Sequence, residues 1–187
     1  MNGQWCYFRN WFSSADCEKI IAELKDSNLQ NPNIGFDYAS QDPSYRRGKI
    51  CWLDEKKYEY VFDEIWKVAR IANEKWFDFH LTGLECVQFS KYQDDGRGFY
   101  KKHQDVFWLN STPHHRKLTC VLQLSNPDSY TGGDLILHDC DQYPDVNDLR
   151  QQGNLIFFPS FLYHEIMPVL SGERYSLVSW IYGPKWK

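Results

Sequence analysis

Long apolar stretches are missing from the sequence, and their absence argues against a membrane-spanning protein. No run approaches the roughly 18 to 20 apolar residues that a transmembrane helix needs. The first residues, Met1 to Tyr7, also lack the basic cluster and the apolar segment of a secretory signal peptide. We therefore expect a soluble, cytoplasmic protein without a membrane partner.

An excess of positive charge and paired cysteines are missing as well. The formal net charge is −4, whereas a general nucleic-acid-binding protein shows a basic surface, so we expect no nucleic-acid partner. Two short basic groups, at 46–49 and 97–102, are interpreted as solvent-exposed loop charges. The six cysteines include no Cys-x-x-Cys pair, which argues against a structural zinc site or a dithiol redox motif.

Aromatic and hydrophobic residues are abundant enough for one folded domain. The chain has 187 residues, of which 17% are aromatic, and a disordered chain would carry far fewer. A chain of this length buries a substantial core as one unit. We expect a single domain over residues 1–187, with helical support over about 1–80 and a strand-rich core over about 84–183.

The order of the predicted elements indicates the fold class. We expect an opening strand over 4–12, a helix from Ser13 to near Asn28, a strand over 50–53 and a long helix over 55–77. Short β-rich segments separated by Gly, Pro, Asn and Asp follow, at 84–92, 100–108, 117–124, 134–138, 154–158, 162–169 and 174–182. Two helices followed by many strands favour an α+β fold in which a sandwich or barrel packs against the helices.

One long segment, from Gln30 to Lys49, has no clear periodicity. It contains two Pro and two Gly, together with the aromatic residues Phe36, Tyr38 and Tyr45. A long irregular loop in a compact domain is often a lid or a binding loop. We predict a substrate lid here, in which Arg46 and Arg47 would approach an acidic or backbone-carbonyl group of the substrate. The alternative is an ordered surface connection whose aromatic residues pack on the helices.

Three residues suggest a metal site. Side chains two positions apart on a strand point to the same face, so His103 and Asp105 would direct an imidazole and a carboxylate to one point. His164, 59 residues after Asp105, supplies a second imidazole if the fold brings the two strands together. Two histidines and a carboxylate form the facial triad of non-heme Fe(II) oxygenases. The same three ligands with a water also suit zinc, so the residue types leave the metal open.

Arg174 adds a cation to this cluster. It lies ten residues after His164, at the start of the last predicted strand. A guanidinium buried in a barrel needs a partner, and its planar fork matches a carboxylate. An open metal site beside a carboxylate-binding arginine suits a dicarboxylate co-substrate, with Arg116 as the alternative clamp.

The chain resembles the prolyl 4-hydroxylase-like branch of the Fe(II)/2-oxoglutarate-dependent dioxygenases. The resemblance is carried by Tyr92, Gly96, the His103-Gln104-Asp105 motif, the Gly132-Gly133-Asp134-Leu135 turn, the His164-Glu165-Ile166-Met167-Pro168 motif and the 174–180 strand, and 12–17 resembles the family's opening helix. It implies a double-stranded β-helix, or jelly roll, with flanking N-terminal helices.

The resemblance also implies roles for single residues. Iron would be held by His103, Asp105 and His164, and Arg174 would bind the distal carboxylate of 2-oxoglutarate. Tyr92 would hydrogen-bond the co-substrate, with Thr119 and Gln123 on a facing strand, and the family also implies ascorbate binding. Two departures are noted: many collagen-type members have Lys where Arg174 stands, and some relatives have a co-substrate-binding Tyr where Gln123 stands.

The remaining histidines are interpreted as structural. His138 alternates within a strand, His114 and His115 follow a Pro in a predicted loop, and His80 ends the predicted long helix. None of them is expected to bind metal.

By this resemblance the protein hydroxylates an unactivated C–H bond and releases succinate and CO₂. A prolyl residue in a peptide or protein is the preferred substrate, and a free amino acid or small metabolite is the alternative. Asp105 argues against a halogenase, in which the carboxylate is missing. Trp180 argues against a nucleic-acid demethylase, because the related demethylases have a second Arg at this position. A metal-free binding module is the non-enzymatic alternative.

Overall fold

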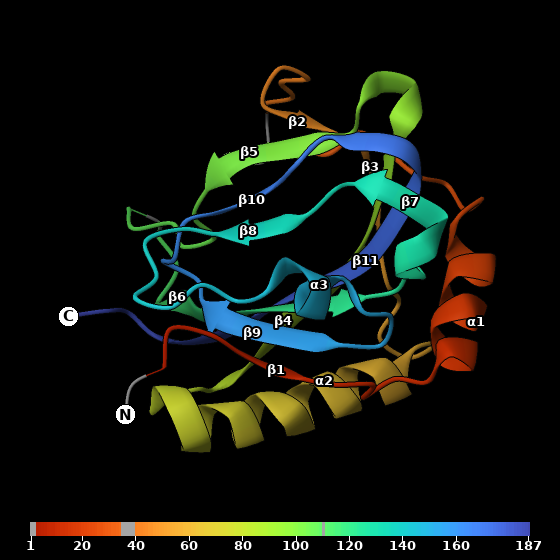
Figure 1. Ribbon diagram of the computed structural model, residues 1–187. Helices are drawn as coiled ribbons and strands as arrows, with labels where there is room; N and C mark the ends of the chain where they lie inside the picture. Colours follow the sequence, from red (N-terminus) through yellow and green to blue (C-terminus); the bar gives the residue numbers. More distant parts are fainter. Residues whose placement is uncertain (1–2, 35–39, 110) are drawn as a thin grey trace.

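The computed structural model describes residues 3–34, 40–109 and 111–187 and consists of two β-sheets and flanking helices (Figure 1). The larger sheet has the strand order β1 (Cys6–Phe8), β9 (Leu155–Pro159), β6 (His114–Gln123), β11 (Val169–Pro184), β4 (Gly83–Gln93) and β3 (Lys49–Trp52), and β7 (Tyr130–Gly132) also pairs with β11. The smaller sheet has the order β2 (Arg46–Arg47), β5 (Phe99–His103), β10 (His164–Ile166) and β8 (Leu135–Leu137).

The two sheets face each other as a jelly roll, which confirms the predicted fold class. All of the strand pairs are antiparallel, and several join segments that lie far apart in the sequence. Strand β10 lies between β5 and β8, and His164 is directly opposite His103 in this pairing. Strand pairing therefore places His164 beside His103, although the two residues lie far apart in the sequence.

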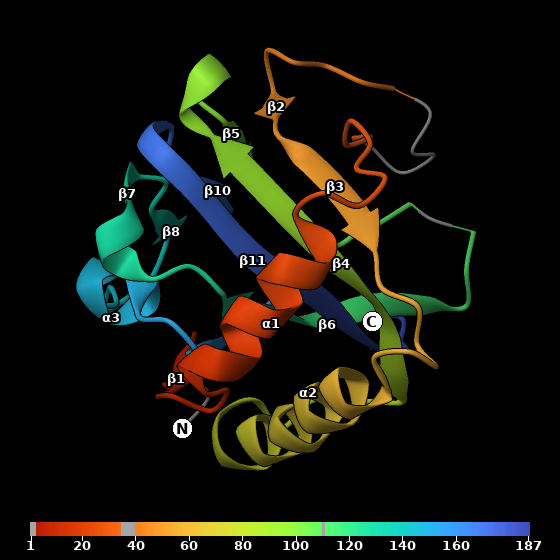
Figure 2. The same cartoon turned by 90° about the vertical axis from the view of Figure 1, so that its right-hand side faces the viewer.

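Two helices cover the outer face of the larger sheet, so that helix, larger sheet and smaller sheet form successive layers (Figures 1 and 2). Helix α1 (Ser14–Leu24) begins with a capping box between Ser13 and Asp16, because each side chain accepts from the other's backbone N–H. Helix α2 (Glu59–Ala72) continues into a π-helical turn, η1 (Asn73–Phe77). Three further helical segments are short: η2 (Asp94–Gly96), η3 (Pro127–Ser129) and α3 (Val146–Arg150).

The main hydrophobic core lies between these two helices and the larger sheet. Helix α2 buries one face against it, including Val61, Ile65 and Val68. Strand β6 contributes alternate residues, with Leu118, Cys120 and Leu122 in this core and the residues between them on the opposite face. The opposite face of the sheet is thereby directed toward the smaller sheet.

The N-terminal segment contributes more than helices. Strands β1 and β3 extend the larger sheet, and β2 forms one edge of the smaller sheet. The predicted helix over 55–77 is shorter as an α-helix, and Asp78 ends its π-helical turn in the left-handed conformation, so His80 lies outside the helix. Among the described residues, no helix has the length and hydrophobicity that crossing a membrane requires.

Two local predictions were wrong in ways that concern the site. Strand β5 ends at His103, so Asp105 lies in the bend that follows the strand and not on the strand itself. His114 and His115 begin strand β6 instead of lying in a solvent-facing loop, and His115 is buried. Pairing with β11 opposite Gly183 and Pro184 extends β6 back to these residues.

Candidate active site

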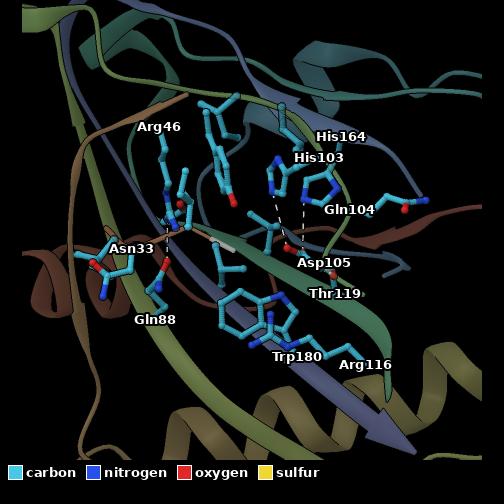
Figure 3. Close-up of a pocket in the computed structure, with 18 of the residues that line it drawn as sticks. Asn33, Arg46, Gln88, His103, Gln104, Asp105, Arg116, Thr119, His164 and Trp180 are labelled. Atoms are coloured by element: carbon cyan, nitrogen blue, oxygen red, sulfur yellow. Dashed lines mark hydrogen bonds and ion pairs between the residues drawn. The ribbon is translucent and has the colours of Figure 1, made fainter. Parts of the chain in front are cut away.

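A pocket of about 750 Å³ lies between the two sheets. The larger sheet lines it with residues of β4, β6 and β11, and the smaller sheet lines it from β2, β5, β8 and β10. His103, Asp105, His164 and Arg174 all contribute to this pocket. Four residues from distant parts of the sequence therefore line one cavity, and Figure 3 shows three of them, His103, Asp105 and His164.

The three proposed metal ligands converge at one side of the pocket. His103 Nε2 lies 3.6 Å from Asp105 Oδ1, and His164 Nε2 lies 3.4 Å from Asp105 Oδ2. One ligand atom from each of the three residues lies within 4.8 Å of the other two, and all three side chains are buried. Figure 3 shows the two imidazoles and the carboxylate directed toward one another.

The hydrogen bonds of the two imidazoles engage Nδ1 and leave Nε2 available to bind a metal. His103 Nδ1 donates to the Lys101 carbonyl oxygen at 2.7 Å, and His164 Nδ1 donates to the Leu162 carbonyl oxygen at 3.0 Å. A carbonyl oxygen only accepts, so each Nδ1 must carry the proton. In the neutral ring the lone pair then lies on Nε2, the atom that faces Asp105.

The protonation states suit metal binding. Burial lowers the pKa of His103 to about 3, and the neighbouring His164 acts in the same direction. Burial opposes ionisation of Asp105, but His164 and His103 outweigh it and hold the pKa of this carboxyl below its usual range. At neutral pH the site therefore offers a neutral imidazole at His103 beside an ionised carboxylate.

Neighbouring groups hold these ligands in place. Thr119 Oγ1 donates to Asp105 Oδ2 at 2.7 Å and lies 3.1 Å from Ser160 Oγ, while the Asp105 backbone N–H donates to the Ser160 carbonyl oxygen at 2.8 Å. The Tyr100 ring stacks on the His103 ring with centroids 3.5 Å apart. Such outer contacts orient metal ligands, and Thr119 provides one of them through the carboxylate.

Arg174 lies in the same pocket without a carboxylate partner. Its side chain is 2% exposed, and Nη1 donates to Ser176 Oγ at 3.1 Å. No ion pair in the described part of the chain includes Arg174. Gly133 gives its stem room: a Cβ there would lie 3.1 Å from Arg174 Cδ, and the φ of +66° at Gly133 disfavours larger residues.

The two other predicted co-substrate residues have different positions. Tyr92 lines the pocket, and its ring lies 6.0 Å from the Arg174 guanidinium carbon. Gln123 is buried and donates through Nε2 to the Tyr130 hydroxyl at 3.0 Å, and it is not among the residues that line the pocket. The structure therefore brings Tyr92 and Thr119 to the pocket and leaves Gln123 outside its wall.

The alternative clamp, Arg116, is already paired. Its Nε and Nη2 donate to the two carboxylate oxygens of Glu85 at 2.9 and 2.7 Å, and its guanidinium lies 3.8 Å from the Trp180 ring centroid. Both Arg116 and Trp180 line the pocket. This bidentate pair makes Arg116 a weaker candidate than Arg174 for a free carboxylate.

Arg46 lines the pocket, and the sequence did not distinguish it from its neighbour Arg47. We interpreted both as solvent-exposed loop charges, or as lid residues that approach the substrate, but Arg46 is 9% exposed and its guanidinium lies 4.4 Å from the Tyr100 ring centroid. Adjacent residues of a strand point to opposite faces, so a strand containing Arg46 and Arg47 directs one of the two inward. That alternation does not say which of the two arginines is buried.

The segment predicted as a lid borders the pocket. Gln30, Asn33, Ile34 and Tyr45 line it, and Tyr45 donates through its hydroxyl to the Lys102 carbonyl oxygen at 3.0 Å. Phe36 and Tyr38, which motivated the prediction, lie outside the described residues. Closure of this segment over a substrate stays a prediction.

His138 lies apart from the metal-ligand candidates. Its Nε2 is 2.9 Å from Glu165 Oε1, and it is not among the pocket-lining residues. Within the described residues, His103, Asp105 and His164 form the only cluster with metal-binding geometry. Two Nε2 lone pairs and an ionised carboxylate fit a divalent metal with further positions open to other ligands.

Comparison with known proteins gives the family that the sequence motifs resemble. Residues 87–182 match the 2OG-Fe(II) oxygenase superfamily. A PKHD-type hydroxylase of Shewanella baltica is 35% identical over 96 residues, which cover 50% of this chain and 41% of that protein. A PKHD-type hydroxylase of Acinetobacter baylyi is 36% identical over 95 residues, again 41% of its length. The chain thus matches less than half of the length of these relatives.

Solved structures share the fold over nearly the whole chain. A prolyl-4-hydroxylase of Pseudomonas putida has a TM-score of 0.73 at 20% identity, covering 99% of this chain and 94% of that one. A prolyl hydroxylase of Trichoplax adhaerens in complex with a hypoxia-inducible-factor peptide has a TM-score of 0.75 at 19% identity, covering 96% and 84%. A viral collagen prolyl hydroxylase of Paramecium bursaria Chlorella virus-1, in complex with 2OG, has a TM-score of 0.72 at 19% identity, covering 96% of each chain.

Proposed function

The chain belongs to the 2OG-Fe(II) oxygenase superfamily, and we propose that it hydroxylates a prolyl residue of a peptide or protein. It is a dioxygenase that uses Fe(II) and 2-oxoglutarate, as its family does. The observation that supports the assignment of the active site is the buried cluster of His103, Asp105 and His164 in the same pocket as Arg174, which forms no ion pair with any described residue.

We assign the metal to His103 Nε2, His164 Nε2 and the Asp105 carboxylate. Bound Fe(II) supplies the oxidising chemistry for which 2-oxoglutarate and O₂ are consumed and succinate and CO₂ are released. The protein's own part is to orient these ligands. The Nδ1–H groups of His103 and His164 donate to backbone carbonyl oxygens, and Thr119 donates to the Asp105 carboxylate. These contacts keep three lone pairs directed at one point before the metal arrives.

Arg174 is the proposed clamp for the distal carboxylate of 2-oxoglutarate. A buried guanidinium without an anion is costly, and a bidentate carboxylate would offset that cost. Tyr92 lies beside it and is suited to hydrogen-bond the same co-substrate. Gln123 is assigned no co-substrate contact, because its side chain is directed to Tyr130 outside the pocket wall. Ascorbate binding stays a prediction from the family.

A peptide substrate is supported by the shape of the site and by the structural relatives. The pocket is large enough for a co-substrate and a substrate side chain, and exposed aromatic residues, Trp52 and Tyr163, are among those that line it. One of the solved relatives is a prolyl hydroxylase bound to a peptide. A free amino acid or small metabolite is the alternative, and the buried cation Arg46 in the pocket favours a small acid.

The test is turnover with Fe(II), 2-oxoglutarate and O₂ on a panel of proline-containing peptides. We expect succinate together with a peptide mass gain of about 16 Da, the mass of one oxygen atom that hydroxylation adds. His138→Ala is a matched control, because His138 lies outside the pocket and should leave turnover unchanged. Succinate without oxidation of any peptide, together with oxidation of a free amino acid, would replace the peptide substrate by the alternative.

A further inference from the structure

The pocket holds a second buried arginine that the co-substrate does not require. Arg46 and Arg174 both line the pocket, and none of the ion pairs among the described residues includes either of them. In contrast, Arg116 is neutralised by Glu85. Arg174 is accounted for by the distal carboxylate of 2-oxoglutarate under the proposed function, which leaves Arg46 unexplained.

The partners of Arg46 are all neutral. Nη2 donates to Gln88 Oε1 at 2.8 Å and lies 3.4 Å from the Tyr92 hydroxyl, as Figure 3 shows for the contact with Gln88. The Tyr100 ring lies under the guanidinium. Nε is buried without a hydrogen-bond partner, and Nη1 donates to no group among the described residues. An arginine stays charged at every physiological pH, so this site carries a cation that lacks an anion.

The position of Arg46 places it close to the metal ligands. Tyr100 stacks on His103 at 3.5 Å on one side and contacts the Arg46 guanidinium at 4.4 Å. The cation is therefore separated from a metal-ligand imidazole by one aromatic ring. A group bound by Arg46 would lie near the reacting position rather than at the rim of the pocket.

The balance of charge also favours one more anion. Among the charged residues that line the pocket, Arg116 is paired with Glu85 and Lys102 with Asp139. Asp105 then contributes one negative charge, and Arg46 and Arg174 contribute two positive charges. A divalent metal and the 2-oxoglutarate dianion cancel each other, so the loaded pocket retains one positive charge. Buried charges that remain unpaired are costly, and a single carboxylate would neutralise this one.

We propose that Arg46 binds a carboxylate of the substrate, close to the carbon that is oxidised. The inference rests on the proposed hydroxylase function and specifies its substrate class as acidic. The carboxylate belongs either to a free amino acid or to an acidic side chain next to the hydroxylated residue. Both sources present the same planar anion to the guanidinium fork.

Two matched pairs of probes test this assignment. One pair is L-proline and L-prolinamide, and the other is the peptide acetyl-Ala-Pro-Glu-amide and its Gln counterpart. Each pair differs only in whether a carboxylate is present. Calorimetric titration in the presence of 2-oxoglutarate, with Mn(II) in place of Fe(II), measures binding without turnover, because Mn(II) accepts similar oxygen and imidazole ligands.

For the wild-type protein we expect the acid of at least one pair to bind more than about tenfold tighter than its amide, as for a buried charge pair. R46Q should reduce that ratio to near one and leave 2-oxoglutarate affinity unchanged. R46K keeps the charge without the planar fork and should retain part of the ratio. R47Q is the matched control, since Arg47 is the exposed neighbour on the same strand and should keep the full ratio.

The outcomes separate the possibilities. Discrimination in the proline pair alone identifies a free amino acid, and discrimination in the peptide pair alone identifies an acidic neighbour. Equal binding of acid and amide by the wild type, or an unchanged ratio in R46Q, overturns the proposal. Loss of 2-oxoglutarate binding in R46Q would reassign Arg46 to the co-substrate and also overturn it. If no succinate forms under any condition, the hydroxylase function fails, whereas the binding ratios still decide the role of Arg46.

Discussion

The two faces of the larger sheet have opposite characters although the same strands form both. On the helix-facing side, β4, β6 and β11 contribute residues such as Phe89, Leu122 and Leu177 to the main hydrophobic core. On the pocket-facing side the same strands contribute polar residues that include Gln88, Thr119, Arg174 and Ser176. All of these side chains are buried, so burial alone does not distinguish the faces.

The difference shows how a β-fold separates stability from chemistry. Side chains alternate across a strand, so every second residue can serve the core while its neighbours serve the pocket. The helix-facing side chains stabilise the fold by removing apolar surface from water. Those on the pocket side retain polar atoms that hydrogen-bond other pocket residues: Thr119 donates to Asp105, Arg174 donates to Ser176, and Gln88 accepts from Arg46. Mutations on the two faces should therefore have different consequences.

The largest effect is expected at the proposed metal ligands, one of which, Asp105, is held by Thr119 of the pocket face. Asp105→Ala, or His103→Ala, should abolish both iron binding and hydroxylation, because only two ligands would remain. Metal content after dialysis and single-turnover oxidation measure the two losses. Ordinary hydroxylation by Asp105→Ala would show that the assignment of the site is wrong.

Next in size is the loss of the proposed co-substrate clamp. Removing one partner of a buried charge pair costs about 2–5 kcal/mol, so Arg174→Ala should raise the KM for 2-oxoglutarate by more than about tenfold. Iron affinity should change little, because Arg174 contacts Ser176 and not a metal ligand. An unchanged KM would move the clamp to another pocket cation, Arg46 or Arg116.

A smaller effect is expected for the residue that orients Asp105. Thr119→Val removes the hydroxyl that donates to Asp105 Oδ2 and keeps the shape of the side chain. Loss of such an outer contact typically lowers metal affinity about 10–100-fold. Thr119→Ser is the control and should retain most of the affinity. Equal metal affinity of the Val and Ser variants would contradict the orienting role.

The smallest effect is expected for the same substitution, Val→Ala, made once on each face of the larger sheet. Val87 lies in the main core on the helix-facing side, whereas Val121 lines the pocket. Val→Ala at Val87 should cost about 2 kcal/mol of unfolding free energy, from lost burial and an added cavity. The same change at Val121 only enlarges an existing cavity and should cost about half as much. Urea unfolding of both variants measures the difference, and equal losses would contradict the distinction between the faces.

Much of the site followed from local features of the sequence. The spacing of His103 and Asp105, together with His164 and Arg174, predicted a metal centre with a carboxylate clamp, and all four residues line one pocket. The combination of two histidines, an aspartate and an arginine made this possible, because together they match an open metal site with a carboxylate-binding cation. The extent of strand β5 was not predictable, because the bend at Asp105 depends on its backbone bond to Ser160.

The sequence by itself determined the elements that depend on local interactions. The capping box of Ser13 and Asp16 and the apolar period of α2 are properties of neighbouring residues, and both helices form in the predicted regions, although each α-helix is shorter than predicted. Only the tertiary structure decided which of Arg46 and Arg47 enters the pocket. Pairing of the two-residue strand β2 with β5 places Arg46 opposite Tyr100, and no local pattern encodes that register. Long-range pairing likewise buried His115 and brought His164 beside His103, because strand partners are chosen by the packing of whole sheets rather than by adjacent residues.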